Sequence, residues 1–264
     1  MHVPAARRTP AIEAEHVRAV YDTIATHWSS TRYKPWPRVA EYLHARCKSG
    51  HLIADLGCGN GKYLGCAPQG VVVVGCDASA ALLSLCSKTP AGRAAELCTA
   101  DVVLLPYRDG QFDAAISIAV LHHLSTRQRR LAAAAEMVRV LRPGGTVLVY
   151  AWAQEQGEES SRSFSHQDML VPWHFADSMR RKSADASTER HGGAKTSQQP
   201  QHGYRAEGKH STVFQRYCHL FKEGEVEALF HRVGGCTVVQ SYYDCSNWCA
   251  VVQKDVADKH NIIE

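Results

Sequence analysis

An acid and three glycines near the first apolar stretch are the residues of this chain best suited to hold a nucleotide-like ligand. They lie in the run Asp-Leu-Gly-Cys-Gly-Asn-Gly at residues 55–61. Because Gly57, Gly59 and Gly61 alternate with other residues, a ligand can approach the backbone closely, and the chain can adopt dihedral angles that a side chain would forbid. A second acid, Asp77, ends the next apolar stretch. Since ligands of α/β proteins bind at the carboxyl ends of parallel strands, the pattern predicts a site there.

The glycine spacing distinguishes two classes of cofactor. A nicotinamide site uses GxGxxG to bring a pyrophosphate to a helix N-terminus, whereas this loop has GxGxG. Asp55, directly before the loop, suits a diphosphate poorly but suits the ammonium group of a methionine moiety. We therefore expect S-adenosyl-L-methionine as the cofactor, in contact with both acids, the three glycines and Asn60 of the loop.

Three more residues complete the expected cofactor site. Asp101 ends the third apolar stretch and is expected to accept a hydrogen bond from the adenine amino group, while Val102 covers the ring. Ala119 ends the fourth apolar stretch at the same edge. Each feature alone is weak, because an aspartate after a strand is commonly a helix cap. Their order along the chain is what favours a methyltransferase over other nucleotide-binding proteins.

Alternating strands and helices are expected to position these residues. Near-continuous apolar strands separated by helices indicate a parallel sheet covered on both faces, so the fold class is α/β, a Rossmann-like class I methyltransferase fold. We expect a mostly parallel seven-stranded sheet that ends in an antiparallel hairpin at residues 236–244 and 247–253. The other expected strands are 51–57, 71–77, 95–102, 112–120 and 146–153, and the expected helices are 12–24, 38–47, one starting at 61, 79–88, 126–141 and 224–233.

The chain is expected to divide into four stretches. Residues 1–50 hold N-terminal helices and a substrate lid, the lid being an ordered loop at 27–37, and residues 51–155 form the cofactor-binding core. Residues 156–210 form an acceptor-side segment whose polar part, from about 180 to 210, is expected to be disordered because it has few apolar residues and no periodicity. Residues 211–264 complete the core.

Composition limits the class of protein. The chain has 264 residues and a formal net charge of +4, which suits an anionic partner such as RNA but does not require one. Ten cysteines without a CxxC pair indicate reduced thiols, and we expect neither a signal peptide nor a membrane span. A cytoplasmic or nuclear protein is the expectation.

Six sequence motifs together resemble one enzyme family. They are HWSSTRYKPWP, DLGCGNGKYL, AVLHHLST with RPGG, QDMLVPWHF, QRYCHLFKEGEVEAL and DCSNW. The combination is similar to the eukaryotic tRNA wobble-uridine methyltransferases that esterify 5-carboxymethyluridine, the group that includes the methyltransferase domain of the human AlkB-homologue fusion enzyme. The resemblance runs from about His16 to Val252, apart from the polar insertion.

The resemblance implies a substrate and a partner. It implies formation of a methyl ester on a uridine carboxylate in the tRNA anticodon loop, with a small zinc-binding activator protein as partner in a heterodimer. The chain departs from the family at Cys218 and Cys249, where an aromatic residue is usual, and in its long insertion. The departures bear on the fit of the acceptor rather than on the glycine loop.

Cations and aromatic rings are the candidates for holding the acceptor. Arg32 and Arg216 offer planar guanidinium groups that fit a carboxylate, although either also suits an RNA phosphate. Trp152 and His122 follow strands at the carboxyl edge and complete the expected catalytic group. Aromatic rings bind unstacked bases, so we expect further side chains to contact the substrate. Each of them also suits core packing or a structural hydrogen bond. The expected substrate-binding residues are Trp36, His123, Tyr217, His219, Asn247 and Trp248.

Two other patterns are weaker. The adjacent histidines His122 and His123 suggest a metal site, but no further ligand has suitable spacing and ester formation needs no metal, so none is expected. Basic residues at 127–130 and 180–182 suit RNA phosphates, although such runs are more often solvated surface.

Two alternative functions stay open at this point. The glycine loop alone fits a methyltransferase for a small carboxylic or phenolic metabolite. The departures at Cys218 and Cys249 and the insertion fit a non-catalytic RNA-binding scaffold of the same fold.

Overall fold

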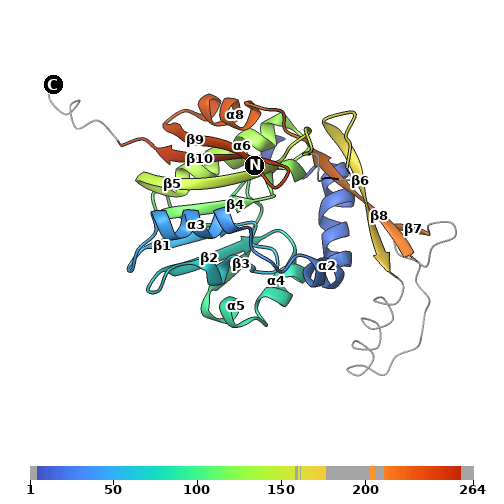
Figure 1. The fold of residues 1–264 in the computed structure, drawn as a ribbon, viewed down its shortest axis with the longest axis horizontal. Helices are drawn as coiled ribbons and strands as arrows, with labels where there is room; N and C mark the ends of the chain where they lie inside the picture. The colour runs from blue at the N-terminus through green and yellow to red at the C-terminus, as the bar shows by residue number, and fades with distance from the viewer. Residues whose placement is uncertain (1–4, 158–159, 161, 177–202, 206–210, 257–264) are drawn as a thin grey trace.

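Seven strands form the main sheet, in the order β3-β2-β1-β4-β5-β10-β9 (Figure 1). The computed structural model describes residues 5–157, 160, 162–176, 203–205 and 211–256. The neighbouring pairs among the first five strands are parallel, whereas β10 is antiparallel to both β5 and β9. The predicted seven-stranded sheet and its terminal hairpin are therefore confirmed. The strands are β1 (Leu52–Leu56), β2 (Val72–Asp77), β3 (Glu96–Thr99), β4 (Phe112–Ile118), β5 (Leu141–Trp152), β9 (Cys236–Asp244) and β10 (Asn247–Lys254).

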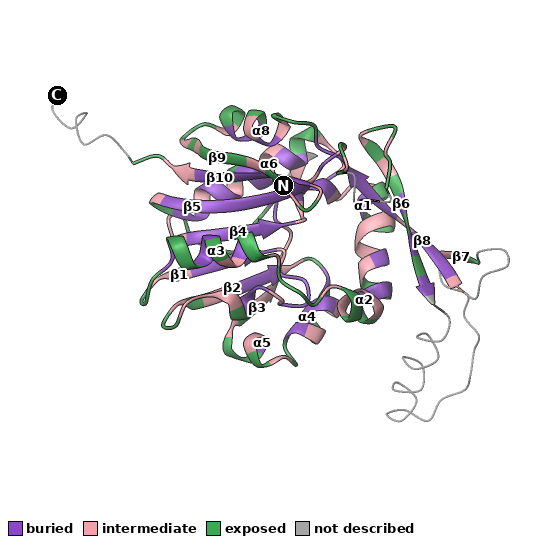
Figure 2. Ribbon diagram, in the orientation of Figure 1, coloured by how far each residue is buried: buried purple, intermediate pink, exposed green. Residues whose placement is uncertain are grey.

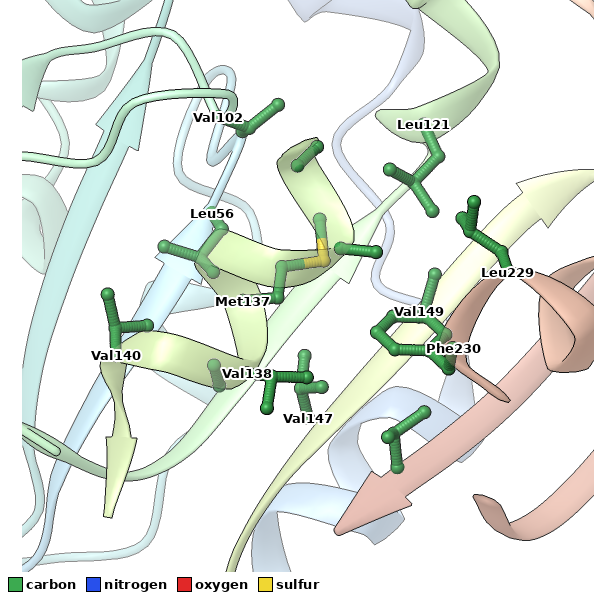
Figure 3. Packing of buried hydrophobic residues seen from close by; sticks show 14 of the residues in the cluster. Leu56, Val102, Leu121, Met137, Val138, Val140, Val147, Val149, Leu229 and Phe230 are labelled. Atoms are coloured by element: carbon green, nitrogen blue, oxygen red, sulfur yellow. The ribbon is translucent and has the colours of Figure 1, made fainter. Parts of the chain in front are cut away.

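Helices cover both faces of this sheet because successive side chains of a buried strand point to opposite sides. On one face Ile53 of β1 packs in a cluster with Leu43 of α3. On the other face Leu56 of the same strand packs in a cluster with Met137 of α6 and Phe230 of α8, as Figure 3 shows. The middle strands are buried, while the outward sides of α3 and α8 are exposed (Figure 2). The helices are α3 (Pro37–Arg46), α4 (Ala80–Cys86), α5 (Pro90–Ala94), α6 (Arg127–Val140) and α8 (Glu225–Val233).

A second, three-stranded antiparallel sheet lies beside the main one, in the order β6-β8-β7 (Figure 1). It consists of β6 (Asp168–Ala176), β7 (Gly203–Arg205) and β8 (Ser211–His219). This sheet was not predicted from the sequence. Its signal was the period-two alternation of β6, in which Val171, Trp173 and Phe175 are buried and the residues between them are exposed.

A nearly continuous N-terminal helix joins the two sheets. It runs through α1 (Ala11–Glu13), the π-helical turn η2 (Ala14–Arg18) and α2 (Ala19–Thr31), after a short turn η1 (Ala5–Arg7). Figure 1 shows α2 between the edge at which the parallel strands end and the second sheet. Val20 and Ile24 of α2 pack in one cluster with Trp173 of β6, so this helix holds the second sheet in place.

Three local expectations are wrong. Residues 27–31 of the expected lid loop are helical, because α2 continues to Thr31 and the breakers Pro35 and Pro37 come only later. The helix expected from residue 61 is only a short 3-10 turn, η3 (Leu64–Cys66), in a stretch interrupted by Gly61, Gly65 and Gly70. The third strand ends at Thr99, two residues before Asp101.

Two further expectations concern the polar insertion and a membrane span. The insertion expected from about 180 to 210 lies outside the described residues except for 203–205, which form β7. Within the described ranges, none of the helices has the length and apolar character needed to cross a bilayer.

Candidate active site

A cavity of about 620 Å³ opens where the parallel strands end, between the glycine loop, α2 with the loop after it, and the second sheet. Its volume falls within the range of small-molecule and cofactor sites. Most of the residues singled out from the sequence line it, which brings together side chains from both ends of the chain. They are Arg32, Trp36, Gly57, Gly59, Asn60, Asp77, Asp101, Val102, Ala119, His122, His123, Trp152 and Arg216.

The glycine loop forms the floor at the main sheet. Gly57 has a φ of +98°, and a Cβ added there would lie 2.2 Å from Cγ2 of Val120. No other residue type fits this position without displacing the neighbouring loop. The amide of Gly59 donates a 2.8 Å hydrogen bond to the Asp77 carboxylate, whose second oxygen accepts from the Ser79 amide, so Asp77 fixes the loop shape.

Asp55 has an unsatisfied carboxylate. Its side chain lies at the end of β1 beneath the loop, it is 2% exposed, and neither oxygen has a hydrogen-bond partner among the described residues. Burial, reinforced by the charge of Asp77, raises its pKa to about 8. A buried carboxylate without a partner is costly, so the position suits a ligand that brings a cation. The ammonium of S-adenosyl-L-methionine fits this requirement.

Asp101 stands at the far side of the cofactor end and is already engaged. Arg18 and Arg129 both donate to its Oδ2, at 2.5 and 2.7 Å, and its Oδ1 accepts from the Val103 amide at 3.2 Å. Arg129 is 1% exposed and also binds Glu13 through Nε. The N-terminal helix is thereby tied to the expected adenine-binding acid, and the interpretation of Arg129 as part of a solvated basic run is wrong.

Three guanidinium groups converge at the opposite end of the cavity. Arg216 of β8 lies 4.8 Å from the ring centroid of Trp173, and Arg32 lies 5.4 Å from the same ring. Arg162 lies 4.9 Å from the ring of Trp152, which Arg216 also approaches. Among the described residues no carboxylate pairs with any of the three, and Nε of the buried Arg216 has no partner.

The pKa values of these groups reflect their crowding. Burial first, and then the charges of Arg162 and Arg216, lower the pKa of Arg32. Burial and the charge of Arg216 likewise lower the pKa of Arg162. Like charges held together in a poorly solvated place repel, and a bound anion relieves that repulsion. This end of the cavity therefore suits an anionic group, with indole rings beside it for a base.

The two histidines between these ends are neutral. Burial is the main reason why the pKa of His123 falls to about 4 and that of His122 well below its ordinary value. His123 donates through Nδ1 to the Tyr217 carbonyl and accepts at Nε2 from the Tyr21 hydroxyl. His122 stacks on Trp152 and accepts a 3.3 Å hydrogen bond from its amide. Neither is a charged group that would attract the acceptor.

The same histidines come within 4.8 Å of the Cys218 thiol, which is the third potential ligand that the sequence spacing did not reveal. Both ring nitrogens of His123 already have partners on the protein. Burial raises the pKa of Cys218 to about 12, so a thiolate is disfavoured. These contacts favour a hydrogen-bonded cluster over a metal centre, and the absence of a metal stays a prediction.

Six of the expected site residues do not line the cavity. Asp55 is buried in β1, and Gly61 lines a second pocket together with Thr89 and Pro90. His219 lies between Asp168 and Glu225, at 2.9 and 2.8 Å, and the Tyr217 hydroxyl also donates to Asp168. The remaining two are in the hairpin, where the Asn247 amide donates to the carbonyls of the β9–β10 turn and the Trp248 indole donates to Glu155.

Sequence reasoning missed several lining residues. Arg162 follows β5 in a polar stretch without periodicity, so nothing in its surroundings indicated a role. Tyr21 lies in the helix expected at 12–24 and was assigned no role in the site, although its hydroxyl reaches His123. Lys62 was the easiest of these residues to predict from the sequence, because it directly follows the glycine loop.

Known proteins resemble this chain in both sequence and fold. Residues 54–149 match the family described as Methyltransferase domain. The fold is similar to the CcbJ methyltransferase from Streptomyces caelestis, with a TM-score of 0.61 at 16% identity over 90% of this chain and 99% of that one. It is also similar to a chain in the complex between the Haloferax volcanii Trm112 methyltransferase activator and a methyltransferase, with a TM-score of 0.51 at 13% identity over 94% and 99% of the two chains. The class I methyltransferase fold and its cofactor, S-adenosyl-L-methionine, are thus confirmed.

Three curated relatives carry one name, tRNA (carboxymethyluridine(34)-5-O)-methyltransferase. The protein of Schizosaccharomyces pombe is 37% identical over 92% of this chain and 98% of its own length. That of Arabidopsis thaliana is 34% identical over 96% and 84%. The Xenopus tropicalis protein, alkbh8, is 36% identical over 92% of this chain, which spans only 41% of that longer relative. Because the match covers 98% and 84% of the Schizosaccharomyces pombe and Arabidopsis thaliana relatives at 37% and 34% identity, this chain belongs to the tRNA (carboxymethyluridine(34)-5-O)-methyltransferase family.

Proposed function

We propose that this protein transfers the methyl group of S-adenosyl-L-methionine to the carboxylate of 5-carboxymethyluridine at the wobble position of tRNA. The observation that carries the proposal is the convergence of Arg32, Arg162 and Arg216 at one end of the cavity, without a carboxylate partner in the described ranges. The names of the relatives supply the substrate. An anionic acceptor is what these unpaired charges require.

The chemistry asks for positioning rather than for a base. A carboxylic acid has a pKa of about 4, so the acceptor is already ionised near neutral pH and needs no group to remove a proton. The cofactor supplies an activated methyl group. The residues of the chain therefore have to bind and align the acceptor, and alignment of two bound reactants is worth several kcal/mol of the barrier.

The arginines are suited to that task. The planar guanidinium of Arg216 can donate two parallel hydrogen bonds to a carboxylate, and its burial keeps water from competing. We assign Arg32 and Arg162 to the same anion or to the adjacent phosphate. The Trp152 ring lines the cavity with His122 stacked on it and the guanidinium groups of Arg162 and Arg216 over it. We assign the uracil to a place beside this ring, because single-stranded bases are held by aromatic side chains and arginine planes.

The histidines take a supporting role in this scheme. His123 holds the Tyr21 hydroxyl, and burial raises the pKa of Tyr21 while the nearby charge of Arg216 partly offsets that rise. His122 supports the Trp152 ring by stacking. We therefore regard both as positioning residues for the acceptor groups rather than as proton-transfer groups.

A partner belongs to the proposal. We infer that a small zinc-binding activator forms a heterodimer with this chain, as the family resemblance implies, and the fold likeness to a chain from a Trm112 complex supports this. The site of action would be the cytoplasm or the nucleus. Co-purification with a Trm112-type protein, and fluorescence microscopy of the tagged chain, test these two points.

The decisive experiment uses tRNA from cells that lack the protein. Purified protein with its activator and methyl-labelled cofactor is expected to convert 5-carboxymethyluridine to its methyl ester, measured by nucleoside mass spectrometry. Label found in a small carboxylic acid and absent from RNA would favour a metabolite methyltransferase. Calorimetry that detects no binding of S-adenosylhomocysteine would favour a non-catalytic scaffold.

A further inference from the structure

We propose that Lys62 binds the α-carboxylate of the amino-acid portion of the cofactor, across from Asp55, which takes its ammonium group. The inference rests on the proposed function and extends it to one residue of the cofactor site. It assigns the anion and the cation of a zwitterionic ligand to separate side chains on either side of the glycine loop.

Lys62 is a largely buried cation that forms no ion pair with any of the described residues. It lines the cavity one residue after the glycine loop, with Nζ 4.8 Å from the ring centroid of Trp36 and 4.6 Å from that of Tyr63. None of the described carboxylates lies within ion-pair distance of it. Burial lowers its pKa to about 8, the charge of Asp55 partly offsets this, and Arg32 adds to it. A carboxylate delivered by a ligand would restore the lost stabilisation.

Asp55 has the complementary defect, although it is buried beneath the glycine loop and does not itself line the cavity. Its oxygens are buried and without partners in the described structure, and Lys62 is the group whose charge lowers its otherwise raised pKa. The two side chains are close enough to influence each other but do not form an ion pair. An amino acid, which carries ammonium and carboxylate on one carbon, satisfies both at once.

The alternative ligand for Lys62 is RNA, and its surroundings argue against it. Its neighbours Trp36 and Tyr63 belong to the cluster that covers the main sheet, where Trp36 stacks on Tyr150. The groups suited to the acceptor, Arg162 and Arg216, lie instead over Trp152 at the end of β5. The cavity thus has one cation beside Trp36 and Tyr63 and a group of cations beside Trp152 and Trp173, with two anions to receive. Arg32 belongs to the second group and lies near enough to Lys62 to lower its pKa.

A pair of ligands that differ only in the carboxylate tests the assignment. We expect the wild-type protein to bind S-adenosylhomocysteine more tightly than its decarboxylated analogue, S-adenosyl-3-thiopropylamine, in calorimetry. Lys62→Met should weaken S-adenosylhomocysteine about tenfold, or 1.4 kcal/mol, and leave the analogue within twofold, so the preference disappears. Lys62→Arg, which keeps the charge, should retain most of the preference for S-adenosylhomocysteine over the analogue. Lys222→Met, at an exposed position outside the cavity, is the matched control.

Three outcomes would overturn the inference. Equal weakening of both ligands in Lys62→Met would mean that the side chain only supports the pocket. Unchanged S-adenosylhomocysteine affinity combined with a raised KM for tRNA would assign Lys62 to the RNA. A wild-type protein that binds neither ligand would remove the proposed function itself, which the other two outcomes leave intact.

Discussion

The two ends of the cavity are built by different means. At the cofactor end, the backbone of a single loop and acids held by amide donors define the shape, and Gly57, Gly59 and Asp77 lie within the one stretch of the chain that runs from β1 to the end of β2. At the acceptor end, the side chains Arg32, Arg162 and Arg216 come from three distant segments and meet over indole rings. The first end is fixed by local sequence, whereas the second exists only after the whole chain has folded.

The difference teaches which part of the enzyme can change independently. A loop fixed by positive φ angles and a buried acid tolerates few substitutions, so it binds one kind of ligand. A set of long side chains resting on aromatic rings can be exchanged one at a time while the fold persists. Specificity for the acceptor is therefore expected to reside in the second sheet and in the N-terminal helix that holds it.

The largest effect is expected where the N-terminal helix meets the cofactor end. Arg129→Met removes the cation shared by Glu13 and Asp101 and leaves two acids in a largely buried site. Loss of one member of a buried ion pair costs about 3 to 5 kcal/mol, so urea unfolding should show a fall of that size. Arg127→Met, at an exposed position of the same helix, is the control and should change little. Equal effects of the two substitutions would show that the N-terminal helix is not anchored through Arg129.

The glycine loop should respond next most strongly. Gly57→Ala combines a positive φ with a Cβ 2.2 Å from Val120. We therefore expect the free energy of unfolding to fall by about 2 to 4 kcal/mol and S-adenosylhomocysteine to bind at least tenfold more weakly. Gly50→Ala has a similar φ of +86° but meets nothing within 4 Å. Gly50→Ala should lower the free energy of unfolding by only about 1 to 2 kcal/mol and leave the binding of S-adenosylhomocysteine intact. If the two variants bound the ligand alike, close approach at Gly57 would not matter.

The sequence revealed the cofactor end almost completely and the acceptor end only in part. The glycine loop and its acids are contiguous, and their spacing reports directly on backbone geometry. Arg32 and Arg216 were identified by residue type and resemblance, whereas Arg162 has no periodic or motif context from which a position could be derived. The register that brings it to Trp152 depends on tertiary contacts.

The fold shows the same division. Strands of the main sheet were predicted because they are apolar along their length, as in the burial of β4 and β5. The second sheet was missed because β6 carries Pro172 and an acid, which suggest a loop, although its alternation of buried and exposed residues is that of a strand. Asn247 and His219 were assigned to substrate because polar residues in specific motifs suggest function, yet their hydrogen bonds hold the hairpin turn and the β8–α8 junction.

At the acceptor end, the smaller but most diagnostic effect is on turnover. Arg216→Lys keeps the charge and loses the planar fork, so we expect kcat/KM for tRNA to fall about 100-fold, which corresponds to about 2.7 kcal/mol of transition-state stabilisation. Binding of S-adenosylhomocysteine should stay within threefold. Arg93→Lys, on the exposed side of α5, serves as the control. A parallel loss of cofactor affinity in Arg216→Lys would mean that the two ends are not separable.

The smallest effect is expected at the boundary between the two ends, where His123 stays neutral. Burial lowers its pKa to about 4 in the folded protein, whereas an unfolded chain has a histidine pKa of about 6.5. Between these values the unfolded state binds a proton that the folded state does not, so the free energy of unfolding decreases as the pH falls from 6.5 toward 4. His123→Gln removes this contribution and should flatten the pH dependence of urea unfolding over that window. His44→Gln, exposed on α3, should leave the slope as in the wild type, and a His123→Gln slope parallel to both would mean that His123 is protonated in the fold.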